Sequence, residues 1–137
     1  MKKLQVTLMI VLCSIFFTNG AIAQNKPLAC QVEKAAGLDW LNGRWVAKTF
    51  DVITAKFILV QAKDGLTRDS AAKALDTYPS EISCRSDSQF TCFDNLGASL
   101  YFDPKTLNGG ISQLYGSIAS GTKKDSVTVR VFSCTPF

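Results

Sequence analysis

Histidine is absent from the 137 residues of this chain. A histidine is the general base in Ser-His and Cys-His catalytic pairs, so neither pair can form. Zinc sites usually combine histidine with closely spaced cysteines such as C-x-x-C, and the sequence contains neither. A regularly spaced acidic loop of the kind that binds calcium is also missing. We therefore expect no metal site and no cofactor.

Basic clusters are scarce as well. Charged residues make up 19% of the chain, and the formal net charge is +4. After the first few residues, Lys123-Lys124 is the one adjacent basic pair. Nucleic-acid-binding proteins carry a clustered basic stripe. The sequence therefore argues against a nucleic-acid partner.

The N-terminal residues have the pattern of a secretory signal peptide. Lys2 and Lys3 precede an apolar run from Leu4 to Phe17, and a small-x-small cleavage pattern ends at Ala23. The run is shorter than the roughly 18 residues typical of a membrane span. We expect cleavage of residues 1–23 and a mature single domain, 24–137, with 13 basic and 11 acidic residues and no membrane span. The expected location is the periplasm of a Gram-negative cell or the medium.

Four cysteines remain in the mature chain, which is typical of a disulfide framework in a short exported protein. Cys84 and Cys92 flank a turn at Ser86-Asp87-Ser88, and a three-residue loop centred on Ser88 places them opposite each other on a hairpin. Cys30 and Cys134 then remain as the second pair. That pair closes a loop of about a hundred residues, worth on the order of 4 kcal/mol in the chain-entropy model.

The residue pattern predicts a mainly β fold, a small antiparallel meander that closes into a barrel or a sandwich and includes one short helix. The helix is expected within "TRDSAAKALDTYP", with Thr67 or Asp69 as N-cap and an end at Pro79. Cys30 to Leu41 is expected to hold a short helical turn before Gly37, and Asn108-Gly109-Gly110 to lie in a loop. Six or seven strands are predicted, at 43–50, 55–62, 81–85, 90–94, 98–103, 111–119 and 127–134.

Two tryptophans flank a turn in "WLNGRW". Gly43-Arg44-Trp45 resembles the G-x-W signature of lipocalin-like (calycin) β-barrels. This resemblance implies that Trp45 closes one end of a barrel, that Trp40 covers its base and that Arg130, on the last strand, stacks over the indole of Trp45. The alternative is that both tryptophans are ordinary core aromatics.

Several residue sets resemble catalytic groups. Ser70-Ala71-Ala72-Lys73 is an S-x-x-K on the expected helix, and Ser86-Asp87-Ser88 and Lys105-Thr106-Leu107 faintly resemble the motifs that accompany it in penicillin-binding enzymes. The chain is too short for that fold, and Lys73 fits a solvent-facing position.

Two pairs of carboxylates are also candidates. Asp94 with Asp103, or Asp51 with Asp64, would have to meet for acid–base chemistry. Single acids at strand ends usually cap turns, so we expect no enzyme.

The aromatic residues indicate a function in binding. Five of them are more than a small core needs, and on one open face they would form a protein- or glycan-binding patch: Tyr78, Phe90, Phe93, Tyr101 and Tyr115. The alternative is that most are buried. We therefore expect a small exported binding protein, of the inhibitor or immunity type, whose partner is another protein. The alternatives are a calycin-like carrier of a small apolar ligand and, ranked last, an enzyme.

Overall fold

The computed structural model of the chain describes residues 25–52, 55–114 and 126–137. The expected signal peptide and Tyr115 lie outside these ranges. Nine strands and one α-helix are found in them. In chain order the elements are β1 (Lys26–Leu41), β2 (Arg44–Phe50), β3 (Lys56–Ala62), β4 (Gly65–Leu66), α2 (Arg68–Leu75), the 3-10 turn η1 (Pro79–Glu81), β5 (Ile82–Ser86), β6 (Phe90–Asp94), β7 (Ser99–Asp103), β8 (Asn108–Gln113) and β9 (Val127–Pro136).

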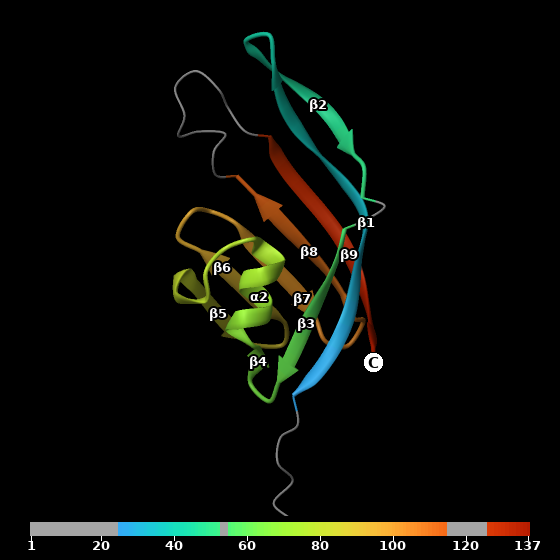
Figure 1. Cartoon of the computed structure of the whole chain (residues 1–137), viewed down its shortest axis with the longest axis vertical. Coiled ribbons are helices and arrows are strands. Elements are labelled where there is room, and N and C mark those ends of the chain that lie inside the picture. The colour runs from blue at the N-terminus through green and yellow to red at the C-terminus, as the bar shows by residue number, and fades with distance from the viewer. Residues whose placement is uncertain (1–24, 53–54, 115–125) are drawn as a thin grey trace, which may run out of the picture.

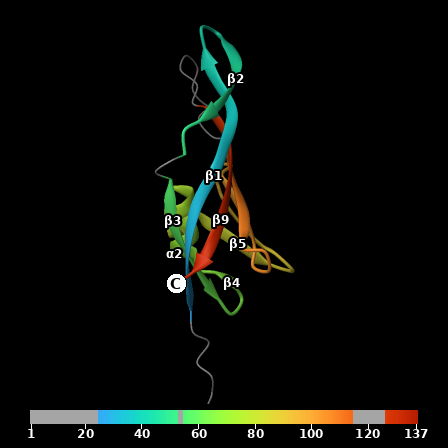
Figure 2. The same cartoon turned by 90° about the vertical axis from the view of Figure 1, so that its right-hand side faces the viewer.

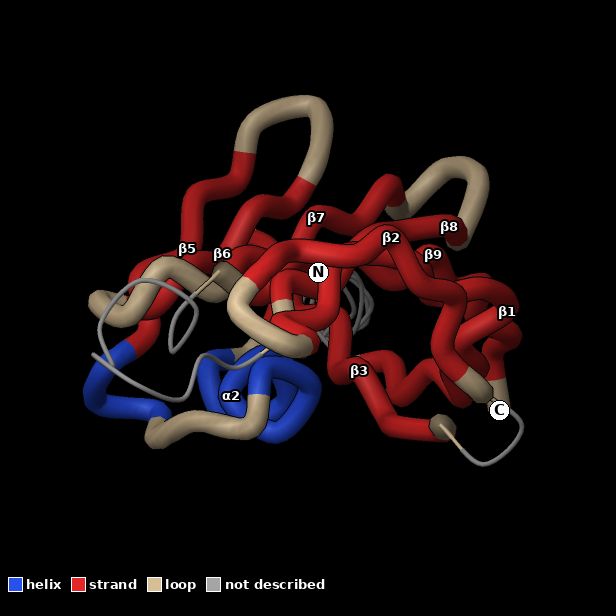
Figure 3. Tube along the Cα trace, turned by 90° about the horizontal axis from the view of Figure 1, so that it is seen from above, coloured by secondary structure: helices blue, strands red, loops and turns tan. Residues whose placement is uncertain are grey.

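The strands form one curved antiparallel sheet in the order β4-β3-β1-β9-β8-β7-β6-β5, and β2 pairs with β1 beside this path. The sheet curves around α2, which lies on its concave side between β3 and β5 (Figure 3). The β4 end of the sheet approaches β5, so the sheet is nearly closed into a barrel. The predicted mainly β meander with one short helix is confirmed.

Strand β1 is the longest strand and is paired along both of its edges. The helical turn expected before Gly37 is therefore wrong. Residues 26–41 are extended throughout, and β1 pairs with β9 on one side and with β3 and then β2 on the other. Pairing on both sides overrides the local helix preference of the alanines. Gly37 itself is required, because a Cβ there would collide with the carbonyl oxygen of Val127.

The expected loop at Asn108-Gly109-Gly110 is also wrong, because these residues open β8. The preceding turn lies at residues 104–107, where Leu107 takes a positive φ of 58°. Gly109 is in the strand because its neighbours leave no room for a side chain: a Cβ would meet the Phe132 ring and the carbonyl oxygen of Tyr101. A glycine pair can therefore signal close packing within a sheet as well as a turn.

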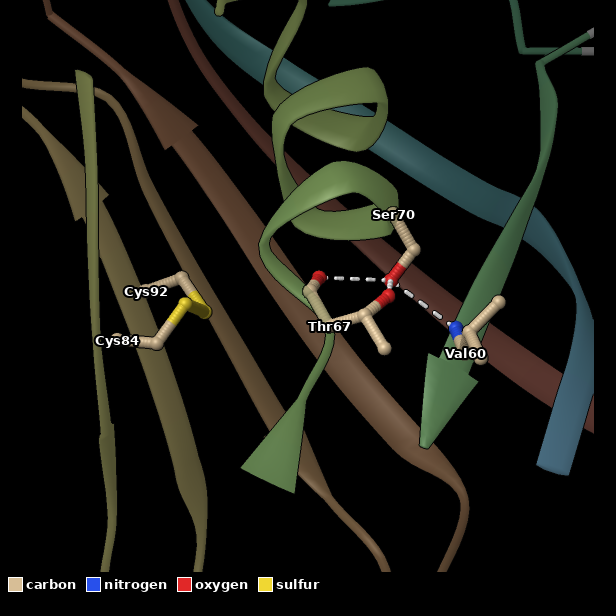
Figure 4. Close-up of a disulfide and its surroundings, with 5 residues drawn as sticks. All are labelled: Val60, Thr67, Ser70, Cys84 and Cys92. Carbon is tan, nitrogen blue, oxygen red and sulfur yellow. Dashed lines mark hydrogen bonds between the residues drawn. A yellow bond between two sulfur atoms is a disulfide. The ribbon is translucent and has the colours of Figure 1, made fainter. Parts of the chain in front are cut away.

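Helix α2 begins after Thr67, one of the two predicted N-caps, and ends at Leu75, where Asp76 adopts the left-handed conformation with a φ of 57°. Its buried Ser70 accepts a hydrogen bond from the backbone N–H of Val60 on β3 at 3.0 Å, and it donates one to the carbonyl oxygen of Thr67 at 3.0 Å. Figure 4 shows this contact between the helix and β3. The helix thereby covers part of an otherwise open strand edge.

The core lies between α2 and the concave face of the sheet. The largest fully buried side chains are Phe102, Phe132, Leu59, Leu75, Leu100, Ile111 and Val32. The rings of Phe102 and Phe132 stack with centroids 6.4 Å apart, and Phe57 packs edge-on against Phe132 at 5.0 Å. Aromatic and aliphatic side chains thus fill the space between α2 and the concave face of the sheet.

Both cysteine pairs expected from the sequence lie at disulfide distance. Cys30 of β1 and Cys134 of β9 are directly opposed, with a Cα–Cα distance of 4.0 Å, and so are Cys84 of β5 and Cys92 of β6. The first bond ties β1 to β9, which lie side by side along much of the molecule (Figure 2). Two disulfides are compatible with an oxidising, exported location.

Candidate functional site

The segment "WLNGRW" forms a hairpin between β1 and β2. Leu41 and Arg44 are the last paired residues, so Asn42 and Gly43 make a two-residue turn, with φ values of 51° and 81°. Positive φ at both positions is typical of the type I′ hairpin turn, which favours Asn-Gly. The hairpin extends past the part of the sheet that α2 covers (Figure 1).

Trp40 and Trp45 face each other across this hairpin. They are directly paired, and their rings pack edge to face with centroids 5.0 Å apart. Arg130 is paired with Ala35, five residues along β1 from Trp40. Because side chains alternate between the two faces of a strand, an odd separation places Arg130 on the concave face and Trp40 on the convex face. The register therefore does not bring Arg130 over the Trp45 ring, as the lipocalin-like resemblance implied.

The convex face around the hairpin is mainly apolar, and it is bordered by the exposed Lys34 of β1, which lies opposite Val131 of β9. Leu38 lies between Ala47 of β2 and Val127 of β9, and Ala36 lies opposite Val129. The exposed fractions are 40% for Leu38 and 52% for Val129. We call this set the hairpin strip, and its members are Ala36, Leu38, Trp40, Trp45, Ala47, Val127 and Val129. Large apolar side chains held this far out of the core form the kind of surface that binds another protein.

The strip continues along the convex face toward the lower part of the sheet. Val131 is 45% exposed and lies opposite Gly110, which in turn pairs with Tyr101, 41% exposed. A shallow depression of about 370 Å³ is lined by these three residues together with Asp103, Thr106, Asn108 and Gly109. A second groove, of about 530 Å³, crosses β3, β1 and β9 around Ile58 and Gln31. The convex face thus offers an uneven surface rather than a deep pocket.

Charges border the hairpin on its concave side. Lys48 donates a hydrogen bond to Asp39 Oδ2 at 2.9 Å, and the Ser126 hydroxyl donates one to Oδ1 at 2.7 Å. Lys48 and then Ser126 thereby lower the pKa of the Asp39 carboxyl. The Lys48 ammonium also lies 5.6 Å from the centroid of the Phe50 ring. These contacts join β2 to β1 and join β1 to the start of β9.

The S-x-x-K sequence does not form a catalytic pair in the structure. The Ser70 hydroxyl accepts hydrogen bonds from the Val60 N–H and the Thr67 hydroxyl, and it donates one to the Thr67 carbonyl oxygen. Ser70 is buried, whereas Lys73 is exposed. Ser70 therefore has a structural role in holding the helix on β3. Lys105, Thr106 and Leu107 belong to the turn between β7 and β8, and Leu107 packs against the core.

Asp94 and Asp103, one of the two acid pairs considered for acid–base chemistry, are apart. Asp94 ends β6 and Asp103 ends β7, which lie antiparallel, so the two residues are at opposite ends of the pair. Asp94 Oδ1 accepts hydrogen bonds from the N–H groups of Leu96 and Ala98. Asp103 accepts one from the N–H of Lys105, which lowers its pKa. Both acids cap turns. Asp51 and Asp64 are exposed.

Of the five aromatics considered for a binding patch, the four in the described ranges do not all share one face, although Phe93 and Tyr101 both lie on the convex face of β6 and β7. Phe90 is buried at 7% exposure, and Phe93 lies under the Arg85 guanidinium, 5.5 Å from its ring centroid. Tyr78 is 72% exposed beside η1, away from Tyr101 on the convex face. Sequence reasoning missed Leu38 and Val129 as surface residues, and these are the exposed large hydrophobic members of the strip. The missed signal was Asn42-Gly43, which predicts a two-residue hairpin turn.

Within the described ranges, no helix is long and apolar enough to cross a membrane. The same ranges contain no group of three or more His, Cys, Asp or Glu side chains that could hold a metal ion. Comparisons with protein-family models, with curated proteins and with solved structures found no match to this chain.

Proposed function

We propose that this is an exported binding protein that docks on an apolar surface of another protein through the hairpin strip. The observation that supports this most directly is the exposure of Leu38 and Val129 in a contiguous apolar patch next to the Trp40–Trp45 pair. Interfaces gain most of their affinity from a few large apolar or aromatic residues in such a patch. The proposed location is the periplasm or the extracellular medium.

Rigidity is the second support for the proposal. The strip lies on β1, β2 and β9, and two of these strands, β1 and β9, are paired over ten residue pairs and joined by Cys30–Cys134. A surface that is fixed before binding loses less conformational entropy when it docks. An inhibitor or immunity-type protein has these properties, because it presents a preformed surface to one partner.

A carrier of a small apolar ligand is the alternative that the G-x-W resemblance favours. It has less support, because Phe102, Phe132 and Leu59 pack in the space inside the curved sheet. A lipid that copurifies with the domain would support the carrier, whereas a retained protein would support the binding module.

The test is affinity capture from periplasmic extract with four baits: the wild-type mature domain, Leu38→Lys, Val129→Lys and Tyr78→Ser. Tyr78 is a matched control, because it is a more exposed aromatic that lies outside the strip. We expect one protein to be retained by the wild type and by Tyr78→Ser, and to be lost with both lysine variants. Equal retention by all four baits, or copurification of lipid alone, would contradict the proposal.

A further inference from the structure

Two Asn-Gly pairs lie in the described part of the chain, and the structure places them in opposite environments. Asn42-Gly43 is the two-residue turn of the β1–β2 hairpin, and both of its residues are exposed. Asn108-Gly109 opens β8, which is paired with β7 on one side and with β9 on the other. Asparagine followed by glycine is especially prone to deamidation, because glycine has no side chain to shield the backbone nitrogen that attacks the asparagine amide.

The hairpin turn leaves the backbone nitrogen of Gly43 accessible. Leu41 and Arg44 are the last paired residues, so the Gly43 N–H lies outside the hydrogen-bonded ladder. A Cβ on Gly43 would have no atom within 4 Å apart from those of its chain neighbours, so the turn is surrounded by open space. The backbone at Asn42 and Gly43 can therefore rotate toward a reactive geometry without a collision.

The second pair, Asn108-Gly109, has neither property. Gly109 is paired with Phe102 and with Phe132, and a residue in a strand that is paired on both sides directs its N–H to one of the two neighbours. A Cβ on Gly109 would meet the Phe132 ring and the carbonyl oxygen of Tyr101, so the backbone has no room to rotate. Reaction at this pair therefore requires local opening of the sheet.

We propose that Asn42 is a site of spontaneous deamidation. The Gly43 nitrogen loses its proton to hydroxide and forms a bond to Cγ of Asn42, and the side-chain amide takes up a proton and leaves as ammonia. Water then opens the resulting succinimide ring, and nothing is oxidised or reduced. Opening at Cγ gives aspartate. Opening at the main-chain carbonyl carbon gives isoaspartate, in which the main chain runs through the former side chain.

The two products have different effects on the hairpin. Aspartate at position 42 preserves the two-residue loop, because Asp-Gly suits a type I′ turn as Asn-Gly does. Isoaspartate adds one carbon to the main chain between Leu41 and Arg44, so the loop no longer aligns Trp40 with Trp45. Both tryptophans belong to the hairpin strip, so isoaspartate should weaken partner binding. That consequence rests on the proposed function, whereas the modification itself does not.

The test is to age the purified mature domain at mildly alkaline pH, in native buffer and in guanidinium chloride, and to map its peptides by mass spectrometry. The mass of each Asn-Gly peptide shows replacement of the amide NH₂ by OH. Endoproteinase Asp-N cleaves before aspartate and not before isoaspartate, so it separates the two products. In native buffer we expect Asn42 to convert at least about tenfold faster than Asn108, because the ladder protects Gly109. In guanidinium chloride the two rates should become similar.

Asn42→Asp is the matched variant, because it carries the charge of the aspartate product on an ordinary main chain. The exciton signal of the Trp40–Trp45 pair in circular dichroism should persist in this variant and decline in aged wild type in proportion to isoaspartate. Equal conversion of Asn42 and Asn108 in native buffer would overturn the proposal. So would an Asn42 that stays intact in native buffer while the unfolded chain converts. Neither readout uses a protein partner, so failure of the proposed function leaves both unchanged.

Discussion

Trp40 of β1 and Trp45 of β2 are a directly paired, edge-to-face couple at the end of a hairpin, with ring centroids 5.0 Å apart. The Asn42-Gly43 turn determines this pairing, because a two-residue loop aligns the residues on either side of it. The same register places Leu38 beside Ala47 and Val127. The geometry of one short turn therefore sets which side chains form the apolar surface.

The two disulfides should contribute unequally to stability. Cys30–Cys134 spans 104 residues and Cys84–Cys92 spans 8, and the chain-entropy model assigns larger stabilisation to the longer loop. We expect the Cys30→Ala/Cys134→Ala variant to lose about 4–5 kcal/mol of unfolding free energy, and Cys84→Ala/Cys92→Ala about 2–3 kcal/mol. Urea denaturation of both variants measures this, and equal losses would argue against the loop-length explanation.

Gly109 and Gly110 should respond differently to the same substitution. A Cβ on Gly109 would collide with the Phe132 ring and the Tyr101 carbonyl oxygen, whereas at Gly110 the nearest atom is the Arg130 carbonyl oxygen at 3.5 Å. We expect Gly109→Ala to destabilise the domain by roughly 1–3 kcal/mol because of overpacking, and Gly110→Ala to have a much smaller effect. Thermal denaturation of the pair gives the comparison, and similar melting temperatures would contradict the close packing at Gly109.

Removal of the Ser70 hydroxyl should cost stability without any effect on partner binding. The Val60 N–H would lose its acceptor in a partly buried position, which costs about 1–3 kcal/mol. Lys73→Ala is the matched control on the same helix, since an exposed substitution usually changes stability by less than about 0.5 kcal/mol. If Ser70→Ala and Lys73→Ala lost the same unfolding free energy in urea denaturation, the Ser70 hydroxyl would not be the group that holds α2 on β3.

The hairpin contacts should depend on pH through Asp39. Lys48 and Ser126 lower the pKa of Asp39 in the folded protein, so the carboxylate stabilises the hairpin above its unfolded pKa. That contribution is lost as the pH falls through the lower, folded pKa. In a ¹³C NMR titration, Lys48→Met should move the pKa of Asp39 back toward its usual value. Asp103, whose pKa is lowered mainly by the N–H of Lys105, should not change, and a joint shift of both would point to a general charge effect.

The elements that depend on nearby residues were predictable from the sequence. The three-residue loop between Ser86 and Phe90 places Cys84 opposite Cys92, and Thr67 marks the start of the helix. The extended conformation of β1 was not predictable in this way. Ala35 and Ala36 are extended because they pair with β9, which lies far along the chain, and with β2, which follows across a turn.

The candidate site was predictable only in part. The two tryptophans were singled out, but their partners in the strip come from three strands, and Val129 is 89 residues from Trp40. The resemblance implied that Arg130 stacks on Trp45, which requires both side chains to lie on one face of the sheet. The β-bulge between Val32 and Lys34 shifts the alternation of side chains along β1, and it therefore sets which face each later residue of β1 occupies. A bulge of one residue cannot be read from the local sequence.

The central claim is tested most directly by methyl cross-saturation NMR on the complex with the captured protein. Saturation of the partner should reduce the methyl signals of Leu38, Val127 and Val129, and leave those of buried Leu59 and Leu100 unchanged. Signal loss at Ile58 or Leu96, with none at the three strip residues, would contradict the account, because the partner would then bind elsewhere on the domain.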